Sequence, residues 1–471
     1  MKTVLLIDDD RGSRLILSWA FKKAGWKVLE AEDGEVGLVL FGQNKPDVVV
    51  CDLMMPRCNG FQVCRSVRSR EDELRSRKII ITTASSYATD RKNAFDSGAD
   101  EYLTKPIDPD ELLKLVARYK EPSAAPATLP ASSRPDAGTS PGPTTPKPVS
   151  FSEDRPARVK FWGVRGSIPT PGPLTAYYGG NTACVELEAD GEIIVLDAGT
   201  GIRPLGLDLV ARYKDQPMDI TVLITHTHWD HIQGFPFFVP AYNPKNKVRV
   251  LGFEGARRGL EGTLSSQMES PYFPISMQQM PANISIQEQK DLQFNIGKVQ
   301  VQAQFMNHPG ICVGYRLNTS SGSVAFIPDN EPFLRLKSET AAQTEKEAAA
   351  ALEYARRQDK KLIEFLRDVD VLIIDAQYDA EEYATHVGWG HSCVDDAVAF
   401  ALSANAKKLF LFHHDPGHDD ERVATMAAQG RALAKRQSSL IEVEAAREGL
   451  EVILKPAPVP EPVEVMEFTL A

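Results

Sequence analysis

The stretch THTHWDH, residues 225–231, directly follows the apolar run ITVLI, residues 220–224. Four of its seven side chains, His226, His228, Asp230 and His231, are imidazoles or a carboxylate, and this combination is typical of Zn²⁺, Mn²⁺ or Fe sites. Such groups are costly inside an apolar core, so we expect them in a loop that follows a strand. A single His-x-His pair would be a weak sign, but this denser pattern predicts a loop wrapped around two divalent ions.

Histidine is unevenly distributed over the rest of the chain. All nine histidines lie between His226 and His418, and the first 225 residues contain none. Further candidate ligands each follow a strand-like run: Asp197 follows 193–196, His308 follows 299–305, Asp329 follows 323–327 and His413 follows 409–412. The clustering indicates a metal site in the second half of the chain.

The pattern His-x-His-x-Asp-His resembles the signature of the metallo-β-lactamase fold, and the later acids and histidines follow in that fold's order over about residues 158–458. The resemblance implies an αβ/βα sandwich with two divalent ions, Zn or else Mn or Fe. It implies these ligands: His226, His228 and His308 for one ion, Asp230, His231 and His413 for the other, and Asp329 as a bridge. Asp197 and His414 are then candidates for supporting a ligand or contacting substrate.

His391-Ser392 lies 22 residues before His413, and the stretch GVRGS at 163–167 precedes the first pair of strands. Both features are similar to the ribonuclease Z and phosphodiesterase branch of that fold. This likeness implies that Asp230 orients the attacking hydroxide and that His391 gives a proton to the leaving oxygen. We find no counterpart of a tRNA-binding arm and the domain is acidic, so a nucleotide or cyclic-nucleotide phosphodiester is the expected substrate.

Three other functions stay open for this domain. A ribonuclease would share the same branch, whereas a lactonase or thioesterase would use the same ions without a His391-Ser392 pair. A non-catalytic signalling module on the same fold is the third alternative, and the complete set of seven ligand positions disfavours it. Metal-dependent phosphodiester hydrolysis is the preferred reading.

The first 120 residues alternate short apolar runs with helical patterns, which predicts five β–α units and a doubly wound parallel sheet. Asp8 and Asp9 end the first run, Asp52 ends the third, and Thr83 and Lys105 end the fourth and fifth. The carboxyl ends of such strands converge. Three converging carboxylates repel one another unless a cation neutralises them, so these residues predict a second cation site.

Residues 1–120 resemble the receiver domain of bacterial response regulators, because the paired acids, the segment DLMMP at 52–56 and the pairs Thr83-Ala84 and Lys105-Pro106 occur in order. The resemblance implies that Asp52 accepts a phosphoryl group from a cognate sensor histidine kinase. It also implies a Mg²⁺ site formed by Asp8, Asp9, Asp52 and the Met54 carbonyl. The residues that would change position on phosphorylation, the switch residues, are Thr83, Tyr102 and Lys105. The Lys105–Pro106 peptide bond is expected to be cis.

Residues 121–157 hold nine of the 32 prolines and few large apolar residues, and they cannot bury enough surface to offset ordering entropy. We therefore expect a receiver domain at 1–120, a flexible linker at 121–157 and a hydrolase domain at 158–471. Because such a linker transmits little torque, control by occlusion or by a receiver homodimer is favoured over direct mechanical coupling. The charged helical stretch 340–367 is expected to be a solvated insertion, with a regulatory docking face as the alternative.

Net charge is −11 and lies mostly in the large domain, where residues 159–471 carry 29 Lys and Arg against 41 Asp and Glu. This balance argues against bulk binding of nucleic acid or anionic membrane. No apolar run approaches the ~18 residues of a membrane span, and the run at residues 4–7 is too short for a signal peptide. With six scattered cysteines, these features predict a cytoplasmic protein with free thiols.

Overall fold

The structure is a computed structural model that describes residues 2–119 and 156–454, except 215, 254–258, 271 and 337–344. Within the described part of the chain, no helix is both long and apolar enough to cross a membrane. The predicted linker, residues 121–157, lies outside the described residues apart from its last two positions. The domain boundaries at 120 and 158 therefore stay predictions.

The N-terminal domain is a doubly wound sheet, as the sequence predicts. Its five parallel strands are ordered β2-β1-β3-β4-β5. Its elements are β1 (Thr3–Ile7), α1 (Arg11–Lys23), β2 (Lys27–Ala31), α2 (Gly34–Asn44), β3 (Val48–Asp52), α3 (Gly60–Arg68), β4 (Lys78–Thr83), α4 (Ala88–Asp96), β5 (Glu101–Thr104) and α5 (Pro109–Ala117). The central strand β3 is buried along its whole length, because helices cover both faces of the sheet.

Two seven-stranded sheets form the larger domain. The first has the order β11-β10-β9-β8-β7-β6-β19, with β6 (Arg158–Gly163), β7 (Cys184–Ala189), β8 (Glu192–Leu196), β9 (Asp219–Leu223), β10 (Lys247–Gly252), β11 (Asn283–Glu288) and β19 (Glu451–Ile453). The second has the order β12 to β18, with β12 (Gln293–Ile296), β13 (Val299–Phe305), β14 (Val313–Thr319), β15 (Gly322–Ile327), β16 (Val371–Asp375), β17 (Lys408–Phe412) and β18 (Glu442–Ala445).

The core of the larger domain lies between the two sheets, where residues such as Phe161, Phe326 and Phe410 are fully buried. Further apolar clusters fill the outer face of each sheet beneath its helices. The helices are α6 (Ile202–Tyr213), α7 (Trp229–Ile232), α8 (Gly259–Ser266), α9 (Phe333–Leu336), α10 (Glu345–Leu366), α11 (Ala380–Tyr383), α12 (Val394–Ser403) and α13 (Asp420–Arg436). The result is the αβ/βα sandwich that the sequence predicts.

The expectation that the stretch 340–367 is a solvated insertion is wrong. Within α10, the side chains of Tyr354, Ala355, Leu362 and Leu366 are buried. Leu362 and Leu366 belong to the apolar cluster on the outer face of the second sheet. Tyr354 instead lines a cavity next to receiver residues. The helix therefore has a buried face, and part of that face turns toward the receiver domain.

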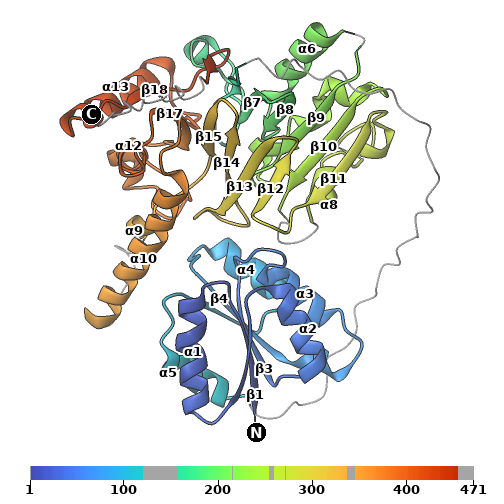
Figure 1. The fold of residues 1–471 in the computed structure, drawn as a ribbon, viewed down its shortest axis with the longest axis vertical. Helices are drawn as coiled ribbons and strands as arrows, with labels where there is room; N and C mark the ends of the chain where they lie inside the picture. The colour runs from blue at the N-terminus through green and yellow to red at the C-terminus, as the bar shows by residue number, and fades with distance from the viewer. Residues whose placement is uncertain are drawn as a thin grey trace, which may run out of the picture.

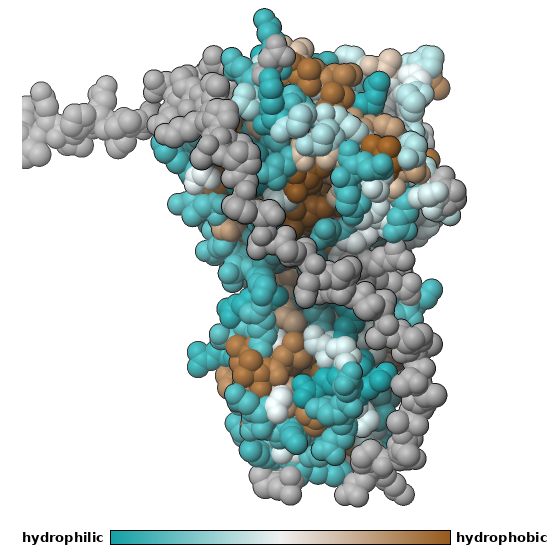
Figure 2. Space-filling model, turned by 90° about the vertical axis from the view of Figure 1, so that its right-hand side faces the viewer, coloured by the Kyte–Doolittle hydropathy of each residue, from teal (hydrophilic) through white to brown (hydrophobic). Residues whose placement is uncertain are grey.

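The two domains touch one another. Figure 1 shows α4 at the end of the receiver that faces the larger domain, while α10 reaches down toward the receiver. Figure 2 shows a smaller and a larger body that meet at a narrower neck, with hydrophilic side chains over most of this face. At one side of the contact, the Arg57 amide donates to the Lys290 carbonyl, and Lys290 pairs with Glu35 at 2.5 Å. The receiver is therefore docked on the larger domain rather than held by the linker alone.

Candidate functional site

The predicted metal ligands of the larger domain come from the carboxyl ends of several strands. His226 and His228 follow β9, and α7 carries Asp230 and His231 directly after them. The other three are His308 after β13, Asp329 after β15 and His413 after β17. These strands run in one direction within their sheets, because β13 and β15 both pair antiparallel with β14 while β15, β16 and β17 are parallel. Their ends therefore open on one edge of the sandwich.

The seven side chains come together at that edge. One ligand atom from each of His226, His228, His308 and Asp329 lies within 4.8 Å of the others. A second group of Asp230, His231 and His413 meets the same distance limit. Asp329 lies between the groups, with Oδ2 at 3.6 Å from His226 Nε2 and Oδ1 at 3.2 Å from His231 Nε2. This geometry matches the two predicted ligand sets and a bridging Asp329, although metal binding itself stays a prediction.

Partners outside the cluster hold several of these rings by Nδ1. His308 Nδ1 lies 2.8 Å from the Gly390 carbonyl, and His231 Nδ1 lies 2.7 Å from Asp197 Oδ2. A carbonyl oxygen can only accept, so His308 Nδ1 carries the proton and Nε2 keeps its lone pair. His413 Nδ1 faces Gln377 Oε1 at 3.2 Å. Outer acceptors of this kind orient metal-binding histidines and fix their tautomer.

Charge in the cluster is concentrated and unevenly balanced. Burial alone would lower the pKa of His231, but Asp230, Asp329 and Asp197 raise it well above its ordinary value. For His226, burial and the neighbouring His231 lower the pKa well below its ordinary value. Burial opposes ionisation of Asp329, yet the surrounding histidines hold the pKa of that carboxyl well below its usual range. An ionised carboxylate among imidazoles is a suitable donor set for a divalent cation, which would displace the proton that His231 holds in its absence.

The donor atoms of the cluster also fit such ions. His226 Nε2, His231 Nε2 and Asp329 Oδ1 are buried, and none has a hydrogen-bond partner among the described residues. Buried polar atoms are normally paired, so these three atoms need a ligand of another kind. Imidazole nitrogens with carboxylate oxygens suit Zn²⁺, Mn²⁺ or Fe. The fold implies divalent ions at this place, and the residues present can hold them.

His391 lies beside the same cluster, just before α12. Its Nδ1 is 2.9 Å from Asp375 Oδ2 and 3.9 Å from Asp329 Oδ2. Burial by itself would lower the pKa of His391, but the carboxylate of Asp375 outweighs this effect and raises the pKa to about 9. A histidine held in its protonated form next to a reaction centre can donate a proton to a leaving group.

Two glycines allow close approach around the ligands. A Cβ on Gly390, whose φ is +91°, would lie 2.5 Å from His308 Nδ1. A Cβ on Gly166 would lie 2.4 Å from the His413 ring. Side chains at these positions would push the imidazoles out of place, so the cluster depends on glycine at both.

The side chain of His414 makes different contacts from that of the preceding residue, the predicted ligand His413. Its ring is buried against Tyr178, with Nε2 at 2.9 Å from the Ala446 carbonyl. Burial lowers the pKa of His414 to about 3. These contacts place His414 between β18 and the Tyr178 loop rather than among the predicted ligands. Asp197, by contrast, contacts His231 directly as a supporting carboxylate.

The receiver acids form a smaller cluster at the ends of β1 and β3. Asp8, Asp9 and Asp52 each offer an oxygen within 4.8 Å of the others. Lys105 Nζ lies 2.6 Å from Asp52 and 2.9 Å from Asp8. Burial and the Asp52 charge raise the pKa of Asp8 to about 6. Met54 lines a cavity that Asp9 and Asp52 also line. The Lys105–Pro106 bond is cis, as predicted.

The predicted switch residues of the receiver are buried and linked. Thr83 Oγ1 accepts from the Ser85 amide at 3.1 Å, and the Tyr102 hydroxyl donates to the Ser85 carbonyl at 3.0 Å. The Ser85 hydroxyl donates to Asp90 Oδ2 at 2.5 Å. Asp90 Oδ1 in turn accepts from the Gly310 amide of the larger domain at 2.7 Å. The switch residues are thus three hydrogen bonds from the loop that carries His308.

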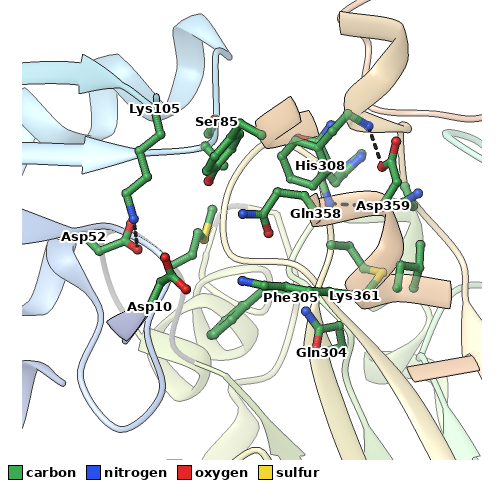
Figure 3. A pocket seen from close by; sticks show the side chains of 18 of the residues that line it. Asp10, Asp52, Ser85, Lys105, Gln304, Phe305, His308, Gln358, Asp359 and Lys361 are labelled. Atoms are coloured by element: carbon green, nitrogen blue, oxygen red, sulfur yellow. Dashed lines mark hydrogen bonds and ion pairs between the residues drawn. The ribbon is translucent and has the colours of Figure 1, made fainter. Parts of the chain in front are cut away.

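A cavity of about 100 Å³ lies between the two domains. Asp52, Asp10 and Lys105 line it from the receiver, and Figure 3 shows Lys361 extending from α10 toward Asp10. Burial raises the pKa of Asp10, but the hydrogen bonds from Ser13 and the charge of Lys361 outweigh it and lower the pKa below its ordinary value. His308 lines the same cavity, so the predicted phosphoacceptor Asp52 and a candidate metal ligand border one space.

Sequence reasoning missed several residues that these sites use. Asp375 ends the fully buried strand β16, just as Asp52 ends β3, so its position alone was a usable signal. Gln377, Glu331, Tyr354 and Lys361 had no comparable signal, because their roles depend on contacts between distant segments.

Comparisons with known proteins agree with this division of the chain. Residues 4–117 match the family model of the response regulator receiver domain. Residues 192–414 match the family model of the beta-lactamase superfamily domain.

Two relatives match the receiver part. Response regulator MprA of Mycobacterium sp. (strain KMS) is 43% identical over 110 residues, which are 23% of this chain and 46% of that protein. The DNA-binding dual master transcriptional regulator RpaA of Synechocystis sp. is 40% identical over 116 residues, or 25% of this chain and 48% of that protein. The chain thus spans about half the length of the relatives it matches.

Among solved structures, the metallo-beta-lactamase fold protein YhfI from Bacillus subtilis is similar, with 17% identity and a TM-score of 0.43. That alignment covers 64% of this chain and 99% of YhfI. Family models, sheet topology and the order of the strand-end residues lead to one assignment: the chain joins a response regulator receiver domain to a domain of the beta-lactamase superfamily.

Proposed function

We propose that this chain is a two-component response regulator whose output is a dinuclear metal-dependent phosphodiesterase. The preferred substrate is a nucleotide or cyclic-nucleotide phosphodiester. One observation carries the choice of reaction: His391 is buried beside the cluster and bonded to Asp375 at 2.9 Å. A leaving alkoxide needs a proton, and a histidine with a raised pKa at this position supplies one.

When bound, the two divalent ions would polarise the phosphoryl oxygens and favour the ionised form of an attacking water. The chain's own residues divide the remaining work. His226, His228 and His308 hold one ion, Asp230, His231 and His413 hold the other, and Asp329 serves both. Asp230 Oδ2 accepts from the Ser167 amide at 2.7 Å, so this carboxylate is fixed and can orient the nucleophile.

His391 would hold the proton on Nε2, because Nδ1 donates to Asp375. Protonation of the leaving oxygen from Nε2 lowers the cost of breaking the phosphorus–oxygen bond. The carboxylate of Asp375 keeps the ring oriented and stabilises its protonated form. A thioesterase expels a thiolate, which needs less help from a general acid than an alkoxide does, and this difference favours the phosphodiesterase over that alternative.

A substrate screen tests the proposal against its alternatives. Purified protein with measured metal content would be assayed on bis(p-nitrophenyl) phosphate, on linear and cyclic nucleotides, on RNA, and on lactone and thioester panels. Turnover confined to phosphodiesters supports the proposal, whereas preferred hydrolysis of lactones or thioesters contradicts it. Preferred cleavage of RNA supports the ribonuclease alternative. No turnover on any panel by fully metallated protein supports the non-catalytic module.

We further propose that phosphorylation of Asp52, by a sensor histidine kinase as phosphodonor, changes this activity. The support is the docked arrangement of the domains. Asp52 is only 6% exposed, and the cavity beside it is completed by α10 and by the loop of His308. A phosphoryl group with its Mg²⁺ would add charge and bulk there, and must alter these contacts. A receiver homodimer remains the other predicted route of control.

A further inference from the structure

Glu331 is a buried carboxylate just beyond the predicted ligand Asp329, and it accepts four hydrogen bonds. Its Oε1 accepts from the Gly388 amide at 2.8 Å and from the Tyr383 hydroxyl at 2.5 Å. Its Oε2 accepts from the Gly390 amide at 2.8 Å and from the Tyr87 hydroxyl at 3.2 Å. The residue is 0% exposed. Hydrogen bonds to an ionised buried acceptor are stronger than neutral ones, so this carboxylate organises everything bonded to it.

Three of the donors belong to the larger domain, and two of them are in the loop 388–390. Gly388 and Gly390 have φ values of +83° and +91°, a left-handed conformation that their amides keep by bonding to Glu331. This loop ends directly at His391. The Gly390 carbonyl also accepts from His308 Nδ1. Glu331 therefore fixes the backbone that positions both a candidate ligand and the candidate proton donor.

The fourth donor belongs to the receiver domain. Tyr87 is 5% exposed and lies at the start of α4. Its single hydroxyl proton is shared between Glu331 Oε2 and the Asn307 carbonyl, which lies 3.1 Å away next to His308. The Tyr87 amide donates to the Ser85 hydroxyl at 3.3 Å, and Ser85 contacts the predicted switch residues Thr83 and Tyr102. The receiver switch thus has a bonded route to Glu331.

We propose that Glu331 is a positioning residue through which the receiver domain sets the loop 388–391 and thereby the placement of His391. This inference rests on the proposed phosphodiesterase function and names its route of control. Movement of the Thr83 and Ser85 hydroxyls on phosphorylation changes the position of Tyr87, and Tyr87 is the donor that this domain contributes to the carboxylate. The larger domain then senses Asp52 through a change at this buried acceptor, beside the separate contact of Asp90 with the Gly310 amide.

Two single-atom variants form a matched pair for the test. Tyr87→Phe removes the receiver hydroxyl from Glu331, and Tyr383→Phe removes a hydroxyl of the larger domain from the same carboxylate. The chain has five tryptophans, and Trp389 lies inside the loop at 60% exposure. Fluorotryptophan labelling and ¹⁹F NMR, assigned with Trp389→Phe, report on the loop without requiring turnover. Mg²⁺ with beryllofluoride replaces the phosphoryl group on Asp52.

We expect beryllofluoride to shift the Trp389 resonance of the wild-type chain and to change turnover by roughly 5–100-fold. In Tyr87→Phe the resonance should no longer respond, and kcat should be lower while KM stays near the wild-type value. Tyr383→Phe should keep the response. Glu331→Gln should lose the response and lower kcat, because an amide cannot accept all four bonds. If the Gln variant fails to fold, the two tyrosine variants still decide.

The proposal is overturned if Tyr87→Phe responds like the wild-type chain, or if Tyr383→Phe loses the response equally. It is also overturned if beryllofluoride does not shift the Trp389 resonance of a wild-type chain that hydrolyses phosphodiesters. A Trp389 response in a chain that hydrolyses no phosphodiester would instead refute the proposed function and leave the positioning role intact. The two failures are therefore distinguishable.

Discussion

The acid cluster of the receiver and the cluster of the larger domain lie at the carboxyl ends of strands, but they balance their charge differently. In the receiver, the positively charged Nζ of Lys105 lies 2.6 Å from Asp52 Oδ2. In the larger domain, every ion pair that Asp230 and Asp329 make within the described residues is with a histidine. The first cluster is partly compensated by a permanent positive charge, whereas the positive partners in the second are histidines, which must give up their protons when they bind a metal.

This difference suits two kinds of chemistry. A site whose carboxylates already face a lysine is suited to the reversible binding of Mg²⁺ and a phosphoryl group that we propose for the receiver. A site made of imidazoles around carboxylates binds its ions through deprotonated rings, so it takes up protons when the ions leave. Four variants test this contrast, and they are given in order of decreasing expected effect.

Asp329→Ala should have the largest effect. Its carboxylate faces both ligand groups, so its removal should release at least one of two ions and abolish most turnover. Elemental analysis of the purified variant measures the ions directly. Glu421→Ala, at an exposed acid of α13, is the matched control. Two retained ions in Asp329→Ala would contradict the bridging role. Loss of beryllofluoride binding by the receiver of the same variant would mean that the two clusters do not behave independently.

His391→Ala should retain both ions and lose roughly 10²–10⁴-fold in phosphodiester turnover, the usual range for loss of a general acid. The loss should be smaller for p-nitrophenyl esters, whose leaving group needs no proton. Turnover on good and poor leaving groups, with metal content, checks this. His386→Ala, which loses a ring stacked on Tyr378 at 4.5 Å, serves as control. An equal loss on both kinds of leaving group would indicate that His391 positions substrate instead.

Asp52→Ala should remove the effect of Mg²⁺ and beryllofluoride on turnover, which we expect to be about 5–100-fold in the wild-type chain, from couplings of ~1–3 kcal/mol. The variant deletes the acceptor but keeps the other acids of the receiver. Turnover and mass in solution should be recorded for both proteins, with and without the mimic. If neither quantity responds in the wild-type chain, the receiver does not control this activity in cis.

Asp375→Asn should have the smallest effect, a shift in the pH profile. The Asp375 carboxylate favours protonated His391, so its neutralisation lowers the pKa of the general acid. A general acid works only below its pKa, hence the alkaline limb of kcat should move to lower pH, by about one unit. Asp370→Asn, just before β16, is the control. An unmoved alkaline limb would assign that limb to another group.

The sequence predicted the positions of the candidate ligands because each one follows a short apolar strand or belongs to the dense stretch 225–231. Strand ends of one direction must meet at one edge, which predicts that these side chains converge, whereas their division into two ligand sets came from the resemblance to the metallo-β-lactamase fold. Asp375 obeys the same rule at the end of β16, and it was overlooked because the strand lacks a neighbouring motif.

Contacts between the domains were beyond the reach of sequence patterns. The charged residues of α10 suggested a solvated helix, yet Tyr354, Leu362 and Leu366 are buried along it. Their spacing of eight and four residues is a helical one and was obscured by the lysines and glutamates between them. Likewise, Tyr87 and Glu331 are 244 residues apart, and nothing local marks such a pair.

The cover over Asp52 has a consequence for timing. A sensor kinase presents its phosphohistidine on a folded domain, which is far larger than a cavity of about 100 Å³. In the proposed phosphorylation of Asp52, such a donor would reach the carboxylate only after the receiver has separated from α10. The rate of phosphorylation by the kinase would then be limited by how often the two domains separate, and it should level off as the donor concentration rises. A small donor such as acetyl phosphate escapes this limit, so the ratio of the two phosphorylation rates measures how tightly the molecule holds itself closed.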